Sequence, residues 1–215
     1  MNNILGILVS FGFVFLIIIL STLFTRYGIE MSRKFVHIAL CNWWIIAMMF
    51  FDNNIYAAIV PFCFIVINYL SLKKNIFKSI ERNEGKGDLG TVYYAISLFI
   101  LALLTFRSDS NPIIGAIGIL IMGYGDGLAA LIGSKVKSPK LPLLKTNKSI
   151  AGSLTMFVVS FIVVAIILII NGESNLVPAL IIALAATILE AVTPLGLDNL
   201  TVPLITALIA ANYFI

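Results

Sequence analysis

The chain has 215 residues, of which 60% are hydrophobic and only 11% are charged. A soluble globular domain carries about 25% charged residues, so this composition excludes a soluble protein built around one buried core. It predicts instead a single integral membrane domain over residues 1–215. The net charge of +4 does not indicate a nucleic-acid partner, because the basic residues lie in loops between apolar segments.

Apolar segments follow one another along the whole chain. A helix that spans a bilayer needs roughly 20 apolar residues. The sequence predicts eight such helices, at about 4–24, 35–51, 55–72, 89–106, 113–133, 150–170, 176–193 and 200–215. The first is expected to be a retained helix, because it is too long for a signal peptide and no basic segment precedes it. The last two are short and contain prolines, which is compatible with partly re-entrant segments. The expected fold is an all-α, polytopic membrane helix bundle.

The basic residues predict the orientation of this bundle. The first, third and fifth loops hold 13 of the 14 lysines and arginines, and Arg107 is the exception. Cytoplasmic loops of membrane proteins carry an excess of Lys and Arg. We therefore expect the odd loops in the cytoplasm, both termini outside, and a multi-pass protein of the cell membrane.

Three acidic residues are expected on the same side as the basic loops. Asp126 lies near the cytoplasmic end of the fifth predicted helix, Glu190 near that of the seventh, and Asp198 in the loop that follows it. A carboxylate at the centre of a spanning helix costs about 2.5–3.5 kcal/mol on insertion scales, so acidic residues within such segments are usually functional. The clustering predicts an active site at the cytoplasmic face.

Cations surround these carboxylates in the sequence. His37, the only histidine, lies four residues after Arg33 and three after Lys34, so the three side chains can share one helical face. Basic flanking of a helix start and a buried, hydrogen-bonded histidine would explain the same residues. Lys148 and Ser149 precede the sixth predicted helix within the segment Lys145–Ser153, where a helix N-terminus could bind phosphate, although Ser149 could equally be a helix cap.

Glycines surround Asp126. Gly123, Gly125 and Gly127 are expected to loosen or break the helix, which is tolerated at membrane depth where the backbone lines a cavity. Asp126 would then hold a divalent cation, with free backbone N–H groups nearby for phosphate oxygens. The alternative is an aspartate that simply reaches the interface. The Gly87–Thr91 end of the middle loop is also expected near the site.

Cations, carboxylates and loosened helix ends at one interface are the groups that phosphoryl transfer requires. In their order and spacing, four segments resemble the polyprenol kinase family, which includes phytol kinase, dolichol kinase and the CTP-dependent diacylglycerol kinase. The resemblance covers about residues 33–203. It rests on RKFVH at Arg33–His37, GYGDGLAALIG at Gly123–Gly133, KSIAGS at Lys148–Ser153, and Glu190 with DNLTVP at Asp198–Pro203.

The resemblance implies a CTP-dependent lipid-alcohol kinase that requires a divalent cation, Mg²⁺. Its acceptor would be an isoprenoid alcohol similar to phytol, farnesol or a polyprenol, or diacylglycerol. The residues expected to act on the reacting groups are Asp126, His37, Lys148 and Glu190, and His37 or a carboxylate would deprotonate the alcohol. The expected magnesium ligand is Asp126, together with Glu190 or Asp198.

The nucleotide is expected to bind to residues of all four segments. These are Arg33, Lys34, Gly125, Gly127, Lys148, Ser149, Gly152 and Asn199. The expected partners are thus a lipid alcohol, a nucleoside triphosphate and the bilayer, with no nucleic acid; a homo-oligomer is left open. Two alternative functions are a CTP-dependent phosphatidate cytidylyltransferase, whose longer signature this chain lacks, and an ion-coupled transporter, for which no inverted repeat is visible.

Overall fold

The computed structural model describes residues 2–74, 89–141 and 148–214. In these ranges the chain is almost entirely helical, and the one strand-like feature is an isolated antiparallel bridge between Lys140 and Ser149. The helices are α1 (Asn3–Ser21), the 3₁₀ segment η1 (Thr22–Tyr27), α2 (Ile29–Leu40), α3 (Trp43–Phe50), α4 (Asn54–Lys74), α5 (Gly90–Thr105), α6 (Pro112–Leu120), the π-helical segment η2 (Ile121–Asp126), α7 (Gly127–Lys135), α8 (Ile150–Ile170), α9 (Val177–Val192) and α10 (Asp198–Phe214).

The predicted all-α fold is confirmed, and each of the eight predicted segments is helical. The second divides into α2 and α3, and the fifth is a continuous run of α6, η2 and α7. In the part of the chain that the structure describes, four helical runs are long and apolar enough to cross a membrane: Asn3–Tyr27, Asn54–Lys74, Pro112–Lys135 and Ile150–Ile170. Helices α5 and α9 are apolar but shorter. The protein is therefore a helical membrane protein, while eight crossings and termini outside the cell stay predictions.

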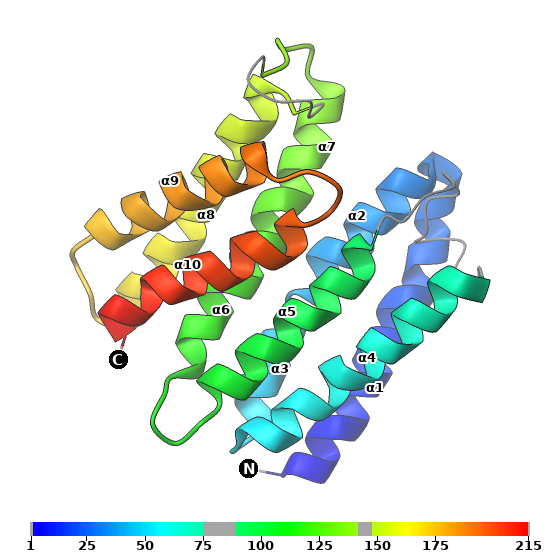
Figure 1. Ribbon diagram of the computed structural model, residues 1–215, viewed down its shortest axis with the longest axis vertical. Coiled ribbons are helices and arrows are strands. Elements are labelled where there is room, and N and C mark those ends of the chain that lie inside the picture. Colours follow the sequence, from blue (N-terminus) through cyan, green and yellow to red (C-terminus); the bar gives the residue numbers. More distant parts are fainter. Residues whose placement is uncertain (1, 75–88, 142–147, 215) are drawn as a thin grey trace.

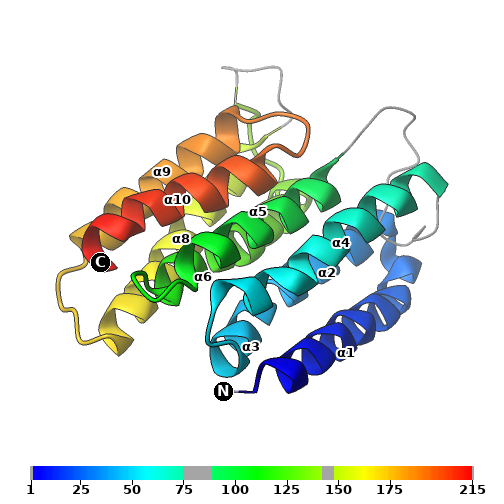
Figure 2. The same ribbon diagram turned by 60° about the horizontal axis from the view of Figure 1, so that its bottom comes forward.

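The helices run alternately up and down the bundle. Figures 1 and 2 show both chain termini at one end, together with the α5–α6 connection, whereas the α9–α10 connection lies at the opposite end. The end of α4 and the start of α5 also lie at that opposite end. Segments that are far apart in the sequence therefore present their ends to one face of the bundle.

Two large clusters of buried apolar side chains, and a small one between α1 and α2, hold the described helices together. One joins α3 to α4, α5 and α6 and contains Trp44 and Phe51; the other joins α6 to α8, α9 and α10 and contains Ile117 and Met156. The outer faces are also apolar: α8 exposes a stripe of residues spaced four apart, namely Leu154, Val158, Ile162 and Ile166. Contiguous apolar surface of this kind marks contact with lipid or protein, and here it fits a bilayer.

Glycines let the α6–α7 run approach α2 closely. A Cβ atom on Gly123 would lie 2.2 Å from Cys41 Cβ, and one on Gly127 would lie 2.3 Å from Ile38 Cγ1. The helix does not break at the glycines, as one expectation had it, but widens to a π-helical segment at Ile121–Asp126. Such segments are rare and often occur at functional sites. The close approach brings Asp126 against α2.

Candidate active site

Asp126 forms the centre of a buried charge cluster. Its side chain is 7% exposed, and Oδ2 accepts a hydrogen bond from Lys34 Nζ at 2.7 Å. The same oxygen lies 3.4 Å from His37 Nε2. Lys34 and His37 are one turn apart on α2, and both contact Asp126 of η2, in agreement with the shared helical face that their spacing predicts.

Lys148 lies among three carboxylates. Just before α8 begins, its Nζ contacts a Glu190 carboxylate oxygen on α9, lies 3.0 Å from Asp198 Oδ2 at the start of α10, and lies 4.0 Å from Asp126 Oδ1. Burial disfavours the ammonium, but the attraction of the three carboxylates outweighs it, so the pKa of Lys148 lies above its ordinary value. Lys148 is therefore a permanent cation in this cluster.

The predicted convergence of Asp126, Glu190 and Asp198 is correct, but the three carboxylates surround an ammonium group. Within residues 2–74, 89–141 and 148–214, no group of three His, Cys, Asp and Glu side chains lies close enough to hold a metal ion. The three carboxylates, as they are arranged here, therefore do not form a cage for magnesium by themselves. Mg²⁺, however, is usually bound by one or two carboxylates together with substrate phosphates.

The cluster fits that kind of magnesium binding. Two ammonium groups, those of Lys34 and Lys148, face three carboxylates, which leaves one negative charge in excess. Glu190 Oε2 is buried, and no described residue hydrogen-bonds to it. An unpaired, buried carboxylate oxygen is costly unless a cation or donor reaches it. The residues therefore suit a magnesium ion that arrives with a nucleotide, and the metal assignment stays a prediction.

The orientation of His37 follows from its partners. Its Nε2 lies 3.0 Å from the carbonyl oxygen of Met122, which can only accept a hydrogen bond. Nε2 is therefore the protonated nitrogen of the neutral ring, which leaves Nδ1 as the basic atom. Tyr94 donates to the His37 carbonyl oxygen at 3.3 Å, and its ring packs against the imidazole edge at 4.9 Å between centroids. His37 is thus held rigidly beside Asp126.

The remaining predicted residues have other neighbours. Arg33 pairs with Glu30 at 3.1 Å and lines a cavity. Gly125 faces Met156 and Ser160 of α8, and Gly152 faces Ala129 of α7, so these glycines permit close helix packing.

Ser149 caps α8, because its Oγ accepts a hydrogen bond from the Gly152 backbone N–H at 3.2 Å and donates to Gly133 O at 3.3 Å. The capping alternative is thus what the structure shows. Phosphate binding by these groups stays a prediction, and the preceding residues 145–147 lie outside the described residues.

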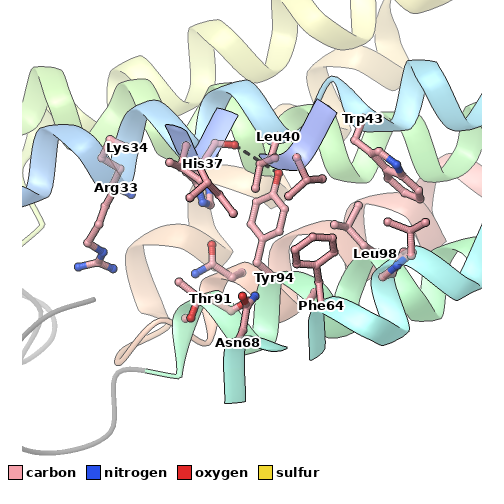
Figure 3. A pocket seen from close by; sticks show the side chains of 18 residues that line it. Arg33, Lys34, His37, Leu40, Trp43, Phe64, Asn68, Thr91, Tyr94 and Leu98 are labelled. Carbon is pink, nitrogen blue, oxygen red and sulfur yellow. Dashed lines mark hydrogen bonds between the residues drawn. The ribbon is translucent and has the colours of Figure 1, made fainter. Parts of the chain in front are cut away.

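A deep cavity adjoins the cluster between α1, α2, α4 and α5 (Figure 3). Lys34, His37 and Asn199 line it, and these residues belong to the charge cluster or lie next to it. Gly90 and Thr91, which were expected near the site, also line it, whereas Gly87 and Asp88 lie outside the described residues.

Sequence reasoning missed the cavity and two of its polar residues. Asn68 of α4 donates to Thr91 O at 3.0 Å, and Tyr94 of α5 contacts His37. A signal for Asn68 existed, because an amide within an apolar, membrane-length segment needs a partner. Nothing local could have indicated the cavity, since residues of six helices line it: α1, α2, α3, α4, α5 and α10.

The chain is similar to curated phytol kinases. The phytol kinase of Synechocystis sp. is 36% identical over 184 residues, which cover 84% of this chain and 78% of that protein. A probable chloroplastic phytol kinase of Triticum aestivum is 32% identical over 207 residues, covering 86% and 68% of the two chains. Phytol kinase 1 of Arabidopsis thaliana, also chloroplastic, is 32% identical over 84% of this chain and 66% of its own length. No family model and no solved structure matches. The motifs, the charge cluster and these relatives agree, and the chain belongs to the phytol kinase family.

Proposed function

We propose that this protein transfers a phosphoryl group from CTP to the hydroxyl group of phytol or a similar isoprenoid alcohol, at the cytoplasmic face of the cell membrane. Membership of the phytol kinase family supports phosphoryl transfer to a lipid alcohol. CTP as the donor rests on the resemblance to polyprenol kinases. The cytoplasmic location rests on the positive-inside rule, because the cluster lies at the end of the helix bundle where the basic residues gather.

The observation that supports the proposal most strongly is that a charged cluster and an apolar cavity lie side by side. The cluster of Lys34, Asp126, Lys148, Glu190 and Asp198 is polar and highly charged, and it adjoins an apolar cavity that opens between helices. A kinase for lipid alcohols must bring a polyanionic nucleotide and an apolar acceptor to the same point. The cluster suits the nucleotide phosphates, and the cavity suits the acceptor.

The two lysines of the cluster do not supply enough positive charge to bind a triphosphate, so the site needs a further cation. Lys34 and Lys148 are both engaged by carboxylates, and the cluster carries an excess negative charge. Asp126, together with Glu190 or Asp198, would hold Mg²⁺ that arrives with the nucleotide, and this ion would supply the missing charge and polarise the phosphoryl oxygens. The ammonium groups of Lys148 and Lys34 can then donate some of their hydrogen bonds to phosphate oxygens. Their positive charges stabilise the negative charge that develops on those oxygens during transfer.

His37 is proposed to take the proton of the alcohol. The alcohol oxygen forms a bond to the γ-phosphorus, the bond from that phosphorus to the bridging oxygen breaks, and the nucleoside diphosphate leaves with the electron pair. The alcohol proton passes to Nδ1 of His37, whose Nε2–H is held by Met122 O. Asp126, 3.4 Å from Nε2, stabilises the imidazolium that forms.

One assay tests this function and separates it from the alternatives. Purified protein is incubated with Mg²⁺, with CTP or ATP labelled in the γ-phosphate, and with phytol, farnesol, a polyprenol, diacylglycerol or phosphatidate. A labelled phospholipid and release of CDP support the kinase. Release of pyrophosphate instead would identify a cytidylyltransferase, and absence of both products with every acceptor would leave ion transport as the better explanation. A faster reaction with ATP than with CTP would overturn the donor assignment alone.

A further inference from the structure

We propose that the cavity between α1, α2, α4 and α5 binds the hydrocarbon tail of the lipid alcohol, with the hydroxyl group directed to the charge cluster and the length of the cavity limiting the length of the tail. This inference rests on the proposed function, because it assigns the acceptor site of the same reaction. The polar end of the cavity is formed in part by motif residues, whereas Val60, Phe64, Ala95 and Leu98 of its apolar part lie outside the motifs.

The lining of the cavity changes from polar to apolar along each of three helices. On the α2–α3 run it passes from Arg33 through His37 to Leu40 and Trp43; Figure 3 shows this order from the cationic end to the indole. Trp43 lines the end of the cavity opposite Arg33 (Figure 3), and its side chain is buried.

The other two helices show the same gradient. On α4, which runs in the opposite direction, the lining passes from Asn68 to Phe64 and then to Val60. On α5 it passes from Thr91 to Leu98. The three polar ends coincide, and they lie beside the charge cluster. A cavity with one polar end and an apolar remainder matches a molecule with one polar head and a hydrocarbon tail.

The position of the polar end fixes the direction in which such a molecule binds. Lys34 and His37 line the cavity and also contact Asp126, at 2.7 and 3.4 Å. A head group at this end therefore lies beside the groups that are proposed to hold phosphate and to accept the proton. A tail bound in the reverse direction would place apolar carbon against the cations Arg33 and Lys34. It would also leave the hydroxyl group at the far end of the cavity, away from the groups that are proposed to hold phosphate and to accept its proton.

Asn199 offers a contact for the hydroxyl group. It lines the cavity at the start of α10, next to Asp198, and its Oδ1 is buried without a hydrogen-bond partner among the described residues. A buried acceptor without a donor is destabilising, and a hydroxyl donor removes that cost in the complex that forms before the same hydrogen turns to His37 for transfer. We had expected Asn199 to contact the nucleotide; the cavity assigns it to the acceptor alcohol instead.

A nucleotide is a poor occupant of this cavity. A nucleobase needs several hydrogen-bond partners when it is buried, and Val14, Val60, Phe64 and Leu98 offer none through their side chains. A triphosphate is strongly hydrated and approaches from water. The cavity therefore belongs to the lipid substrate, and the nucleotide is left to the other side of the cluster.

The cavity predicts two changes of chain-length preference that have opposite signs. Ala95→Phe places an aromatic ring in the middle of the cavity and should reduce kcat/KM for phytol relative to the shorter geraniol by about tenfold or more, since even one methylene in an apolar pocket changes selectivity by about 10–200-fold. Leu98→Ala lengthens the inner end and should shift the optimum toward longer prenols. Leu104→Ala, the same change on the lipid-facing side of α5 where the residue is 54% exposed, should leave the preference unchanged.

The measurement is kcat/KM for geraniol, farnesol, phytol and a longer prenol with each variant. A variant that is merely misfolded loses activity with all four alcohols together, so the ratio between alcohols reports on the cavity. If the wild type phosphorylates these alcohols but neither Ala95→Phe nor Leu98→Ala changes their ratio, the tail site is refuted while the kinase function stands. If the wild type phosphorylates none of them, the proposed function fails.

Asn199→Ala tests the hydroxyl contact separately. It should lower kcat/KM about equally for all four alcohols and leave the KM for the nucleotide unchanged. A rise in the nucleotide KM with unchanged use of the alcohols would return Asn199 to the nucleotide site and refute its assignment here. Tail binding itself can be followed without turnover: a photoreactive phytol analogue, in the absence of nucleotide, should label α2, α4 or α5, and excess phytol should suppress the labelling. Labelling that phytol does not suppress would contradict the site.

Discussion

Replacement of Asp126 by asparagine removes one charge from the buried cluster and keeps the shape of the side chain. In the wild type, Asp126 Oδ2 accepts the ammonium hydrogen bond of Lys34 at 2.7 Å, and Oδ1 lies 4.0 Å from Lys148 Nζ. The amide oxygen of asparagine can still accept from Lys34, but without its charge. Lys148 keeps its contacts with Glu190 and Asp198, so the loss falls mainly on Lys34 and His37.

The size of the effect can be estimated from these contacts. A hydrogen bond between charged groups contributes about 1.5–3 kcal/mol, whereas complete removal of one partner of a buried pair costs about 3–5 kcal/mol. Because asparagine keeps an acceptor, the lower range applies, which corresponds to a fall in Tm of roughly 3–12 °C for a chain of this size. Loss of one preorganised electrostatic group usually costs about 10²–10³ in kcat, so catalysis should suffer far more than stability.

The matched control is Asp109→Asn. Asp109 also pairs with a cation, Arg107 at 2.7 Å, but this pair is exposed and lies in the α5–α6 connection, at the other end of the bundle. Salt screens such exposed pairs, and many contribute nothing measurable. Asp109→Asn should therefore keep the Tm and the rate of the wild type.

The assay combines the rate of phospholipid formation at saturating nucleotide and phytol with thermal unfolding of the purified protein in detergent. We expect Asp126→Asn to insert, purify and unfold cooperatively, with the stated loss of kcat. Full activity of Asp126→Asn would falsify the assignment of this carboxylate to the catalytic cluster. Equal losses in Asp126→Asn and Asp109→Asn would show that the effect does not arise from the cluster.

Three further predictions follow from the packing and charge of the site. Lys148→Met leaves the surrounding carboxylates without their shared ammonium and should lower stability by about 3–5 kcal/mol; addition of Glu190→Gln in the same chain should recover part of the Tm, and no recovery would contradict the charge balance. Gly123→Ala would place a Cβ 2.2 Å from Cys41 Cβ and should lower stability by about 1–3 kcal/mol. The control Gly12→Ala, whose new Cβ would meet nothing within 4 Å, should be neutral or slightly stabilising. Equal Tm values of the two variants would contradict the close approach of α2 and the α6–α7 run. Chelation of divalent cations with EDTA should abolish phosphorylation and added Mg²⁺ should restore it; turnover that persists in EDTA would refute the magnesium proposal.

Much of the helical architecture could be predicted from the sequence, because the length of an apolar segment is a local property. The eight predicted segments are helical, and their boundaries agree within a few residues except at the second, which was predicted to begin at residue 35 and begins at Ile29. The break between α2 and α3 was not predicted, because the residues at the break are Cys41 and Asn42, and neither is a proline or a glycine.

The membership of the cluster was also largely predictable. Asp126, Glu190 and Asp198 are carboxylates in or beside apolar segments, and each needs a buried partner there. Charge spacing selected Arg33, Lys34 and His37 together, but the structure distinguishes them: Lys34 and His37 meet Asp126, while Arg33 pairs with Glu30 and lines the cavity. The glycines were correctly singled out as unusual, yet those around Asp126 permit helix contact and do not break the helix.

The sequence by itself thus determined a polytopic helical membrane protein, the face on which its polar residues gather, and the kinase family that its motifs resemble. Hydropathy, charge spacing and short motifs are read along the chain, so no knowledge of packing is needed for them. Only the tertiary structure decided that Lys148 occupies the space between the carboxylates, that Ser149 caps α8, and that a cavity with one polar end adjoins the cluster. These features depend on how helices from distant parts of the chain approach one another, and the physical reason is close packing: whether a gap or a contact forms between two helices depends on side chains of both, which no local pattern can specify.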